Sequence, residues 1–308
     1  MIYVVDFCSG EKWNAANYYI SLKIKLFMTN PLGKAKEGRN KPDYTNKHKT
    51  SVPSLIDQVI SEADIILEVL DARFIEKTRN VELENKIKSL GKVLIYIFNK
   101  SDLVDINKIK LEEDYGDLKP SLFFSSTNRK GSATLVRMIK IQVKKIKKDA
   151  EKDAVNIGVI GYPNTGKSSM INLLAGRAVS RTSSEAGFTK GIQKIKIFSG
   201  VYLIDTPGII PIEEKTYGNR KLLAKHAKIG ATTWYKAKDP DVIVFEIMKE
   251  YPGILEAHYN IPADGDVEVL IEKLGRRLSY LKKGNEVDED RTAKHILRQW
   301  QEGKIRVR

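Results

Sequence analysis

Residues 155–168 read VNIGVIGYPNTGKS, and this stretch decides the fold of the chain. Its apolar start is followed by Gly161, four residues, Gly166, Lys167 and Ser168, and a helical pattern begins at the lysine. Glycines let backbone N–H groups turn inward around a phosphate, and a helix N-terminus adds a positive dipole. The stretch therefore predicts a phosphate loop between a buried strand and a helix, because these flanking elements argue against a chance match on an ordinary turn.

The residues of this loop have distinct predicted roles. Lys167 would reach the β- and γ-phosphates of a nucleotide, and Ser168 would ligate Mg²⁺. The other residues expected to contact the nucleotide here are Gly161, Pro163, Asn164, Thr165, Gly166 and Ser169.

A second motif, Asp-Thr-Pro-Gly at 205–208, ends another apolar run 37 residues after Ser168. An aspartate at the tip of a strand beside a phosphate loop can hold Mg²⁺, usually through water. Gly208 has no side chain, so its N–H could approach a γ-phosphate. Thr189 lies between the two motifs and is a candidate Mg²⁺ ligand. We therefore expect Mg²⁺ at Ser168, Thr189 and Asp205, and catalytic contacts from Lys167, Thr189 and Gly208.

Residues 99–102 read NKSD and directly follow the apolar run 93–98. The Asp102 carboxylate can accept hydrogen bonds from guanine N1–H and the exocyclic amine, whereas adenine would leave it unpaired at a cost of about 1–3 kcal/mol. The Lys100 stem would cover the base, and Asn99 would tie this loop to the phosphate loop. The alternative interpretation of a lone tetrad is a helix-capping turn.

A weaker motif, FSST at 124–127, follows the next apolar run. Backbone N–H groups of Ser125, Ser126 and Thr127 are expected to meet the guanine oxygen, with a plain serine-rich turn as the alternative. All the parts of a GTPase are then present, but the base-reading motifs precede the phosphate loop, which usually comes first. A circular permutation explains this order, because the termini of a domain usually lie at its surface and close together.

Apolar runs alternate with helical patterns from residue 52 to 204, which predicts a parallel sheet covered on both faces. The segment 192–198 alternates apolar and polar residues and predicts an edge or antiparallel strand. After residue 238 we expect only helices, the first capped by Asp239 with Pro240 at its first position. The helices expected there cover 240–250, 266–282 and 289–302.

The predicted fold class is therefore α/β: a circularly permuted P-loop GTPase fold with a mostly parallel sheet, plus a small all-helical C-terminal domain. The expected domains are an N-terminal extension with a basic arm at 1–50, the GTPase domain at 51–237 and an RNA-contacting helical domain at 238–308. Residues 20–26 alternate like a strand, which is compatible with an added edge strand; the interpretation we favour is that Met28 is the true start. We expect residues 1–27 to be dispensable for nucleotide binding.

The chain has 308 residues, with 53 Lys and Arg against 39 Asp and Glu, and a net charge of +14. Such an excess suggests an anionic partner, most commonly nucleic acid. The single cysteine, Cys8, argues against a disulfide framework or a Cys-based zinc site. No run of 18 apolar residues exists, so we expect no membrane span.

The helix expected at 266–282 is divided into an apolar and a basic face. The apolar side chains expected to pack inward are Leu270, Ile271, Leu274, Leu278 and Leu281. The residues expected to contact RNA are Lys273, Arg276, Arg277, Tyr280 and Lys283. The helix expected at 134–148 also has a basic face, and a solvated surface is the alternative for both helices.

The motif order NKSD, FSST, GYPNTGKS and DTPG resembles the circularly permuted GTPases of ribosome assembly, in the YlqF/YawG branch with bacterial ribosome biogenesis GTPase A and nucleolar GTP-binding proteins. Asp71-Ala72-Arg73 resembles the DAR motif of that branch, and residues 275–304 resemble its helical RNA-contacting domain. Ala186 stands where the family carries a proline, which weakens only the expected shape of the Thr189 loop.

The resemblance implies binding of GTP and GDP with Mg²⁺, and a role in late assembly of the large ribosomal subunit in the cytoplasm. The implied partners are rRNA and a ribosomal subunit precursor. Ile209 stands where many GTPases orient water with glutamine, so intrinsic hydrolysis should be slow and stimulated by the partner. In similar GTPases an asparagine at the position of Asn164 helps to hold K⁺.

Two other functions are compatible with these motifs. One is an RNA-binding assembly scaffold that holds GTP as a structural ligand and has no relevant hydrolysis. The other is a permuted GTPase of the small-subunit type, which is disfavoured because that type resembles an N-terminal barrel with a C-terminal zinc site, whereas this chain has one cysteine.

Overall fold

The computed structural model describes residues 3–5, 12–14, 52–112, 115–176, 193–206, 208, 210–211, 214 and 220–306. The chain forms two compact units. The sheet unit is Asn40–Lys215, and the helical unit is Thr216–Val307 together with Met1–Arg39. The expectations for residues 20–26, Ala186, Thr189 and Ile209 lie outside the described residues.

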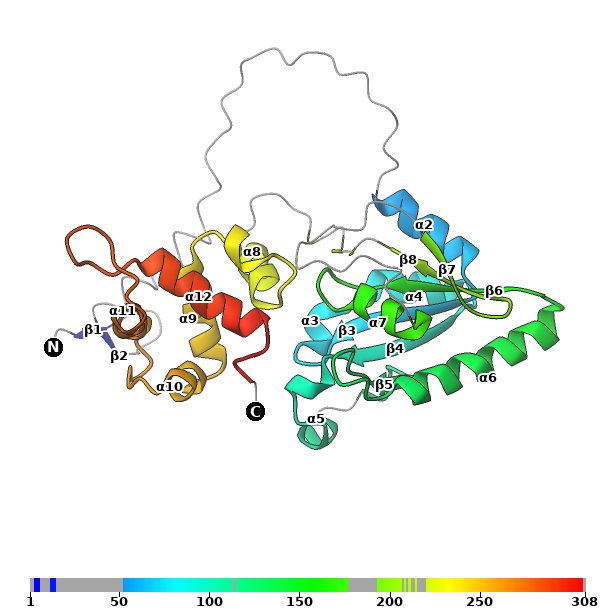
Figure 1. The fold of residues 1–308 in the computed structure, drawn as a ribbon, viewed down its shortest axis with the longest axis horizontal. Coiled ribbons are helices and arrows are strands. Elements are labelled where there is room, and N and C mark those ends of the chain that lie inside the picture. Colours follow the sequence, from blue (N-terminus) through cyan, green and yellow to red (C-terminus); the bar gives the residue numbers. More distant parts are fainter. Residues whose placement is uncertain are drawn as a thin grey trace, which may run out of the picture. The chain divides into compact units, whose positions relative to one another are not determined.

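The sheet unit is built on a six-stranded sheet in the order β5-β4-β3-β6-β8-β7 (Figure 1). Five strands are parallel, and β7 lies antiparallel to β8 at one edge. The strands are β3 (Ile65–Asp71), β4 (Val93–Asn99), β5 (Ser121–Phe123), β6 (Val155–Ile160), β7 (Gln193–Phe198) and β8 (Val201–Asp205). The predicted mostly parallel sheet and the antiparallel edge strand are therefore confirmed.

Helices cover both faces of this sheet, which explains why its central strands are apolar throughout. Every residue of β3 is buried. One core cluster joins Ile65 and Ile95 to side chains of α6 and α7, and the other joins Ile66 and Leu94 to side chains of α2, α3 and α4. The helices of the unit are α2 (Val52–Glu62), α3 (Ile75–Thr78), α4 (Val81–Ser89), η1 (Ser101–Leu103), α5 (Ile106–Glu112), α6 (Ser132–Ala150) and α7 (Lys167–Ala175).

The helical unit contains no strand longer than three residues within the part that the structure describes. Its helices are α8 (Arg220–Lys228), η3 (Trp234–Lys236), α9 (Pro240–Glu250), α10 (Ile254–Tyr259), α11 (Val267–Arg277) and α12 (Glu289–Gln301). Two short strands near the N-terminus, β1 (Tyr3–Val5) and β2 (Lys12–Asn14), pair antiparallel. None of the helices in the described ranges is long and apolar enough to cross a bilayer.

The division between the units differs from the boundary expected at residues 237/238. Trp300 is fully buried and donates its Nε1–H to the Lys228 carbonyl at 2.9 Å. Gln301 Nε2 donates to the Ala227 carbonyl at 2.7 Å, and Gln301 Oε1 accepts from the Trp234 N–H at 3.0 Å. These bonds hold α8 and η3 against the last helix, so both elements belong to the helical unit.

Two local expectations in this unit are wrong. Asp239 adopts a left-handed conformation with φ 48° and its side chain does not cap α9, although Pro240 does occupy the first turn. Helix α11 ends at Arg277 because Ser279 turns left-handed with φ 55°, and the chain then forms a hairpin through the Lys282 N–H and the Glu286 carbonyl. Leu281 is therefore 41% exposed instead of packing inward.

Candidate nucleotide-binding site

The predicted motifs meet because the carboxyl ends of neighbouring parallel strands lie at one edge of the sheet. Asp71 at the end of β3 is aligned with Asn99 at the end of β4, and Val159 of β6 is aligned with Asp205 of β8. The order of the motifs along the chain therefore does not affect their position in space. Ligands of open α/β sheets bind outside these carboxyl ends.

Asn99 joins the base-reading motif to the phosphate loop. Its side chain is buried and donates from Nδ2 to the Thr165 carbonyl at 2.7 Å, across 66 residues of sequence. Its Oδ1 accepts from the Ser126 N–H at 3.2 Å and from the Ser126 hydroxyl at 3.1 Å. One amide thus ties three predicted motifs together, and the expected link to the phosphate loop is present.

Gly166 is required where the side-chain amide of Asn99 packs against the phosphate loop. It has a left-handed φ of 96°, and a Cβ at this position would lie 2.2 Å from Asn99 Nδ2. Only glycine combines this backbone conformation with so close a contact. The second glycine of the phosphate motif therefore makes room for the base-reading motif.

Lys167 lies at the start of α7 and is almost fully buried. Its Nζ donates to the carbonyls of Gly161 at 3.0 Å and Tyr162 at 2.7 Å. Burial lowers the pKa of Lys167 to about 8, although the nearby Asp205 carboxylate opposes this shift. Because burial removes water from the Lys167 ammonium, a phosphate bound next to it would stabilise the charged form.

The DTPG motif lies against the phosphate loop through Gly208. A Cβ on Gly208 would lie 2.7 Å from the Cα of Pro163 and 2.8 Å from its nitrogen, so a side chain would push the two segments apart. Asp205 is fully buried at the tip of β8. The Thr206 hydroxyl donates to the Val159 carbonyl at 2.6 Å and fixes the chain after that tip.

On the base side, Asp102 and Ser125 connect the NKSD and FSST motifs. The Ser125 hydroxyl donates to Asp102 Oδ1 at 2.5 Å and accepts from the Asn128 N–H at 3.0 Å. Ser125 is buried, and its own N–H is bonded to the Lys130 carbonyl at 3.0 Å. Ser125 therefore holds the carboxylate that is predicted to read guanine. The backbone N–H groups of Ser125 and Ser126, which were expected to meet the guanine oxygen, bond instead to the Lys130 carbonyl and to Asn99 Oδ1.

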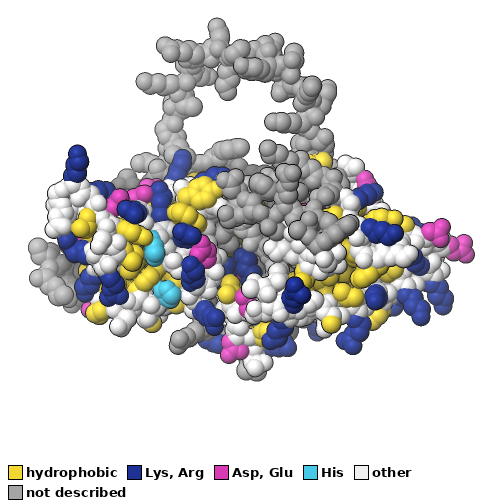
Figure 2. Space-filling model, viewed as in Figure 1, with side chains coloured by type: hydrophobic (Ala, Val, Ile, Leu, Met, Phe, Trp, Pro, Cys, Tyr) yellow, Lys and Arg dark blue, Asp and Glu magenta, His cyan; other side chains and the backbone are white. Residues whose placement is uncertain are grey.

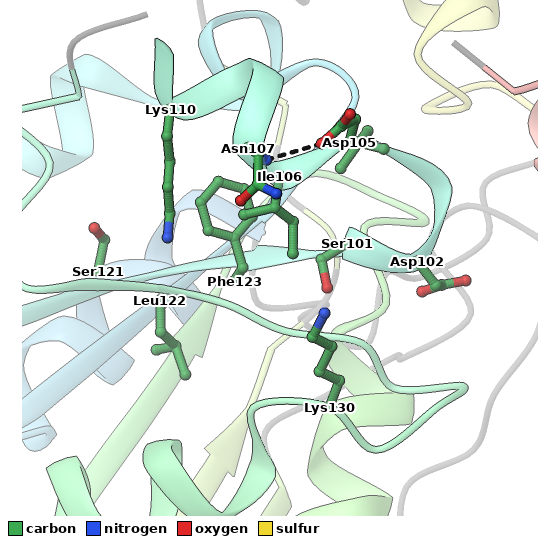
Figure 3. Close-up of a pocket in the computed structure, with 11 residues that line it drawn as sticks. Ser101, Asp102, Asp105, Ile106, Asn107, Lys110, Ser121, Leu122, Phe123 and Lys130 are labelled. Carbon is green, nitrogen blue, oxygen red and sulfur yellow. Dashed lines mark hydrogen bonds between the residues drawn. The ribbon is translucent and has the colours of Figure 1, made fainter. Parts of the chain in front are cut away.

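Beside these residues lies a pocket of about 890 Å³, which η1, α5 and β5 line. Figure 3 shows Lys110 and Lys130 on different walls of the pocket, with Ser101 next to Lys130 and Asp102 at the edge. The pocket therefore begins at the base-reading motif and continues along the edge strand β5.

Lys100 has a partner that the sequence analysis missed. Its backbone is left-handed with φ 62°, and its Nζ lies 2.7 Å from Asp71 Oδ2. Asp71 also accepts from Arg73 Nε at 3.0 Å and from Arg73 Nη2 at 2.8 Å. Burial alone would raise the pKa of Asp71, but the two cations hold it well below its usual range. The available signal was its position, because Asp71 also ends an apolar strand.

The remaining site residues differ in how well they are placed. The Thr165 hydroxyl donates to the Tyr162 carbonyl at 3.0 Å and shapes the loop. Asn164 is left-handed with φ 60°, and Ser168 is partly exposed in the first turn of α7. Thr127 and Ser169 are exposed.

The residues expected to bind RNA are mostly bonded within the helical unit. Lys273 Nζ donates to the Pro262 carbonyl at 2.7 Å, and Arg276 pairs with Glu272 at 2.6 Å. Arg277 donates to the carbonyls of residues 259 and 260, and the Tyr280 hydroxyl lies 3.2 Å from His295 Nδ1. Lys283 is exposed. Four of these five side chains therefore have a partner within the helical unit.

Residues 156–263 match a family model described as 50S ribosome-binding GTPase. The chain is 38% identical over 262 residues to an uncharacterized GTP-binding protein of Methanocaldococcus jannaschii, covering 83% of this chain and 66% of that protein. It is 34% identical over 259 residues to nucleolar GTP-binding protein 2 of Saccharomyces cerevisiae, covering 80% of this chain and 51% of that protein.

The fold is similar to the crystal structure of GNP-bound YlqF from T. maritima, with a TM-score of 0.57 and 25% identity, over 82% of this chain and 93% of that one. The family match begins at β6, so the NKSD motif lies before it, as a permuted order requires. This chain belongs to the circularly permuted GTPases of the YlqF type. It spans about two thirds of its archaeal relative and about half of the nucleolar members of this family.

Proposed function

We propose that this protein is a guanine-nucleotide switch that binds and hydrolyses GTP during assembly of the large ribosomal subunit, through contact with rRNA. The observation that carries the proposal is the Asn99 amide, which joins the phosphate loop to both base-reading motifs. If the phosphate loop were an ordinary turn between a strand and a helix, it would not need a buried link to the loop that carries Asp102, the carboxylate proposed to read guanine.

The nucleotide would lie across the carboxyl edge of the sheet. Asp102 would accept from the guanine edge, and Lys167 would bind the β- and γ-phosphates. Lys167 is already held among loop carbonyls and needs little rearrangement to meet an anion. Gly208, packed on Pro163, would sense the γ-phosphate through its N–H.

The residues at the phosphate end fit Mg²⁺. Asp205 is a buried carboxylate whose charge acts on Lys167, and Ser168 presents a hydroxyl from the first turn of α7. Hard oxygen ligands of this kind suit Mg²⁺, and Thr189 is the third ligand in this proposal. Bound Mg²⁺ would supply positive charge to the phosphate oxygens, while Lys167 and the loop N–H groups orient them.

The proposal includes K⁺ beside Asn164, whose backbone is left-handed with φ 60°. GTP hydrolysis measured in KCl and in NaCl at equal ionic strength, with Asn164→Ala in parallel, tests this part. We expect faster turnover in KCl that the variant loses. Equal rates in the two salts would leave Asn164 with the role of shaping the loop.

The names of the relatives support the choice of process. The family description refers to 50S ribosome binding, and the yeast relative is called a nucleolar GTP-binding protein. In this proposal the partner is a large-subunit precursor in the cytoplasm, and Lys273, Arg276, Arg277, Tyr280 and Lys283 of the helical unit contact its rRNA. Hydrolysis is slow until this partner binds.

Two experiments test the proposal in sequence. In the first, GTP, GDP and ATP compete for a fluorescent guanine nucleotide, and equal affinity for ATP and GTP refutes guanine recognition. In the second, the protein is sedimented with purified ribosomal subunits, with and without a non-hydrolysable GTP analogue, and turnover is measured with each subunit. We expect association with the large subunit that depends on the analogue and stimulates hydrolysis, whereas association without stimulation would favour the scaffold function.

A further inference from the structure

Helix α6 carries a dense set of positive charges in the sheet unit. From Ser132 to Lys148 its sequence contains no acidic residue. The basic side chains in this interval are Arg137, Lys140, Lys144, Lys145, Lys147 and Lys148. The positive side chains of this run repel one another, and they are unfavourable for the isolated helix because like charges at i,i+4 destabilise it.

The opposite side of α6 is anchored in the core, which determines where the charges point. Leu135, Ile139 and Val143 are buried in the cluster under the sheet. At about 100° per residue the six cations lie within an arc of about 160° away from these side chains. Figure 2 shows Lys and Arg side chains in a row along the edge where α6 runs in Figure 1.

These cations have no neutralising partners among the described residues. No carboxylate there forms an ion pair with the set Arg137, Lys140, Lys144, Lys145 and Lys148, all of which are exposed. Lys140 lies over the Phe198 ring at 5.2 Å, and only Lys147 donates to a backbone carbonyl, that of Asp153. Two exposed lysines elsewhere on this unit do have such partners, Lys86 with Asp57 at 2.7 Å and Lys194 with Glu62 at 2.8 Å.

The geometry fits an extended row of anions better than a single one. Between Arg137 and Lys148 the helix rises about 16 Å at 1.5 Å per residue. A nucleic-acid backbone presents phosphates along such a distance, and neutralising them releases counterions. A membrane surface is disfavoured, because interfacial helices bury an apolar face in the bilayer and the apolar face of α6 is already occupied by the core.

We propose that the exposed basic face of α6 is a second RNA-binding surface, which holds the phosphate backbone of structured RNA on the sheet unit. It rests on the proposed function for the identity of the nucleic acid, and it deepens that proposal by adding a contact outside the helical unit. The exposed cations of α6 are available to phosphates, whereas Lys273, Arg276 and Arg277 already bond within their own unit.

The test compares two double variants of equal charge in the full chain. Lys144→Gln/Lys148→Gln removes two free cations of α6, and Lys86→Gln/Lys194→Gln removes two paired cations of the same unit. The probe is an RNA duplex of about 16 base pairs, a length that double-stranded-RNA-binding domains span. Affinity is measured by fluorescence anisotropy at several salt concentrations.

We expect the α6 variant to lower the slope of log affinity against log salt by about 1.4 to 1.8, which corresponds to two lost phosphate contacts. The control variant should change the slope by much less. The proposal is overturned if both variants bind the duplex like the unchanged protein or lose affinity equally. It is also overturned if α6 is needed for binding vesicles of phosphatidylserine and phosphatidylcholine but not for binding RNA.

Two further measurements separate this surface from the proposed function. GTP affinity of the α6 variant should equal that of the unchanged protein, because none of its substituted residues contacts the nucleotide site. Lys273→Gln/Arg276→Gln, tested on the same duplex, reports on the helical unit alone. A normal α6 effect without guanine recognition would refute the switch and leave the RNA surface standing.

Discussion

Replacing Asp71 by asparagine should strongly destabilise the sheet unit while keeping the shape of the side chain. Asp71 is fully buried, and its partners Arg73 and Lys100 have side chains that are 2% and 23% exposed. Removing one member of a buried ion pair costs about 3–5 kcal/mol, because the remaining charges lose their partner. A domain is stable by about 5–15 kcal/mol, so Asp71→Asn should lose a large part of the free energy of unfolding.

The pH dependence of this loss follows from the sign of the pKa shift. The pKa of Asp71 is lowered in the folded protein, so its charge stabilises the fold at every pH above about 4, where the unfolded chain is also ionised. That contribution disappears only as the pH falls below this value toward the folded pKa. The difference between the unchanged protein and Asp71→Asn should therefore be constant near neutral pH and shrink in acid.

Urea unfolding followed by far-UV circular dichroism measures this change. The three tryptophans, Trp13, Trp234 and Trp300, all lie in the helical unit, so their fluorescence reports separately on the part that should be unaffected. Glu76→Gln is the matched control, because Glu76 is 58% exposed in its pair with Arg79 and should cost less than about 1 kcal/mol. An Asp71→Asn protein within about 1 kcal/mol of the unchanged one would refute the reasoning.

Two other changes test the site, at Lys167 and Gly208, and a third tests the buried Glu68 of β3. Because burial lowers the pKa of Lys167 to about 8, GTP binding near pH 9 should take up a proton, which calorimetry in buffers of different ionisation enthalpy detects and which Lys167→Gln abolishes. Burial and the charge of Glu84 raise the pKa of Glu68 to about 8. Between pH 4.5 and 8 the unfolded chain therefore loses a proton that the folded protein keeps, and the free energy of unfolding should fall by up to about 1.4 kcal/mol per pH unit. Glu68→Gln should remove this slope. Gly208→Ala should weaken GTP more than GDP in a competition titration, because the new Cβ clashes with Pro163 beside the expected γ-phosphate, and an unchanged ratio of the two affinities would contradict this placement.

Local patterns were sufficient to predict most elements of the sheet unit. The strands β3, β4 and β6 are apolar runs, and such a run is sufficient to predict a strand that is buried on both faces of a sheet. The alternation of β7 predicts an edge or antiparallel strand, and its antiparallel pairing with β8 confirms this. Errors occurred where the backbone conformation of one residue decides the outcome, as at Asp239 and Ser279, because a left-handed conformation there leaves no periodic trace in the sequence.

The sequence by itself determined the chemistry of the site, because the phosphate loop, NKSD and DTPG are local motifs that each end a strand. Tertiary structure decided which side chains meet: Asn99 with Thr165, and Lys100 with Asp71. It also decided which cations have partners within the protein, because a run of charges looks the same in the sequence whether its side chains bond to nearby groups, as around α11, or face solvent, as on α6. Pairing depends on distances between segments far apart in the chain, whereas periodicity records only which face of a segment is apolar.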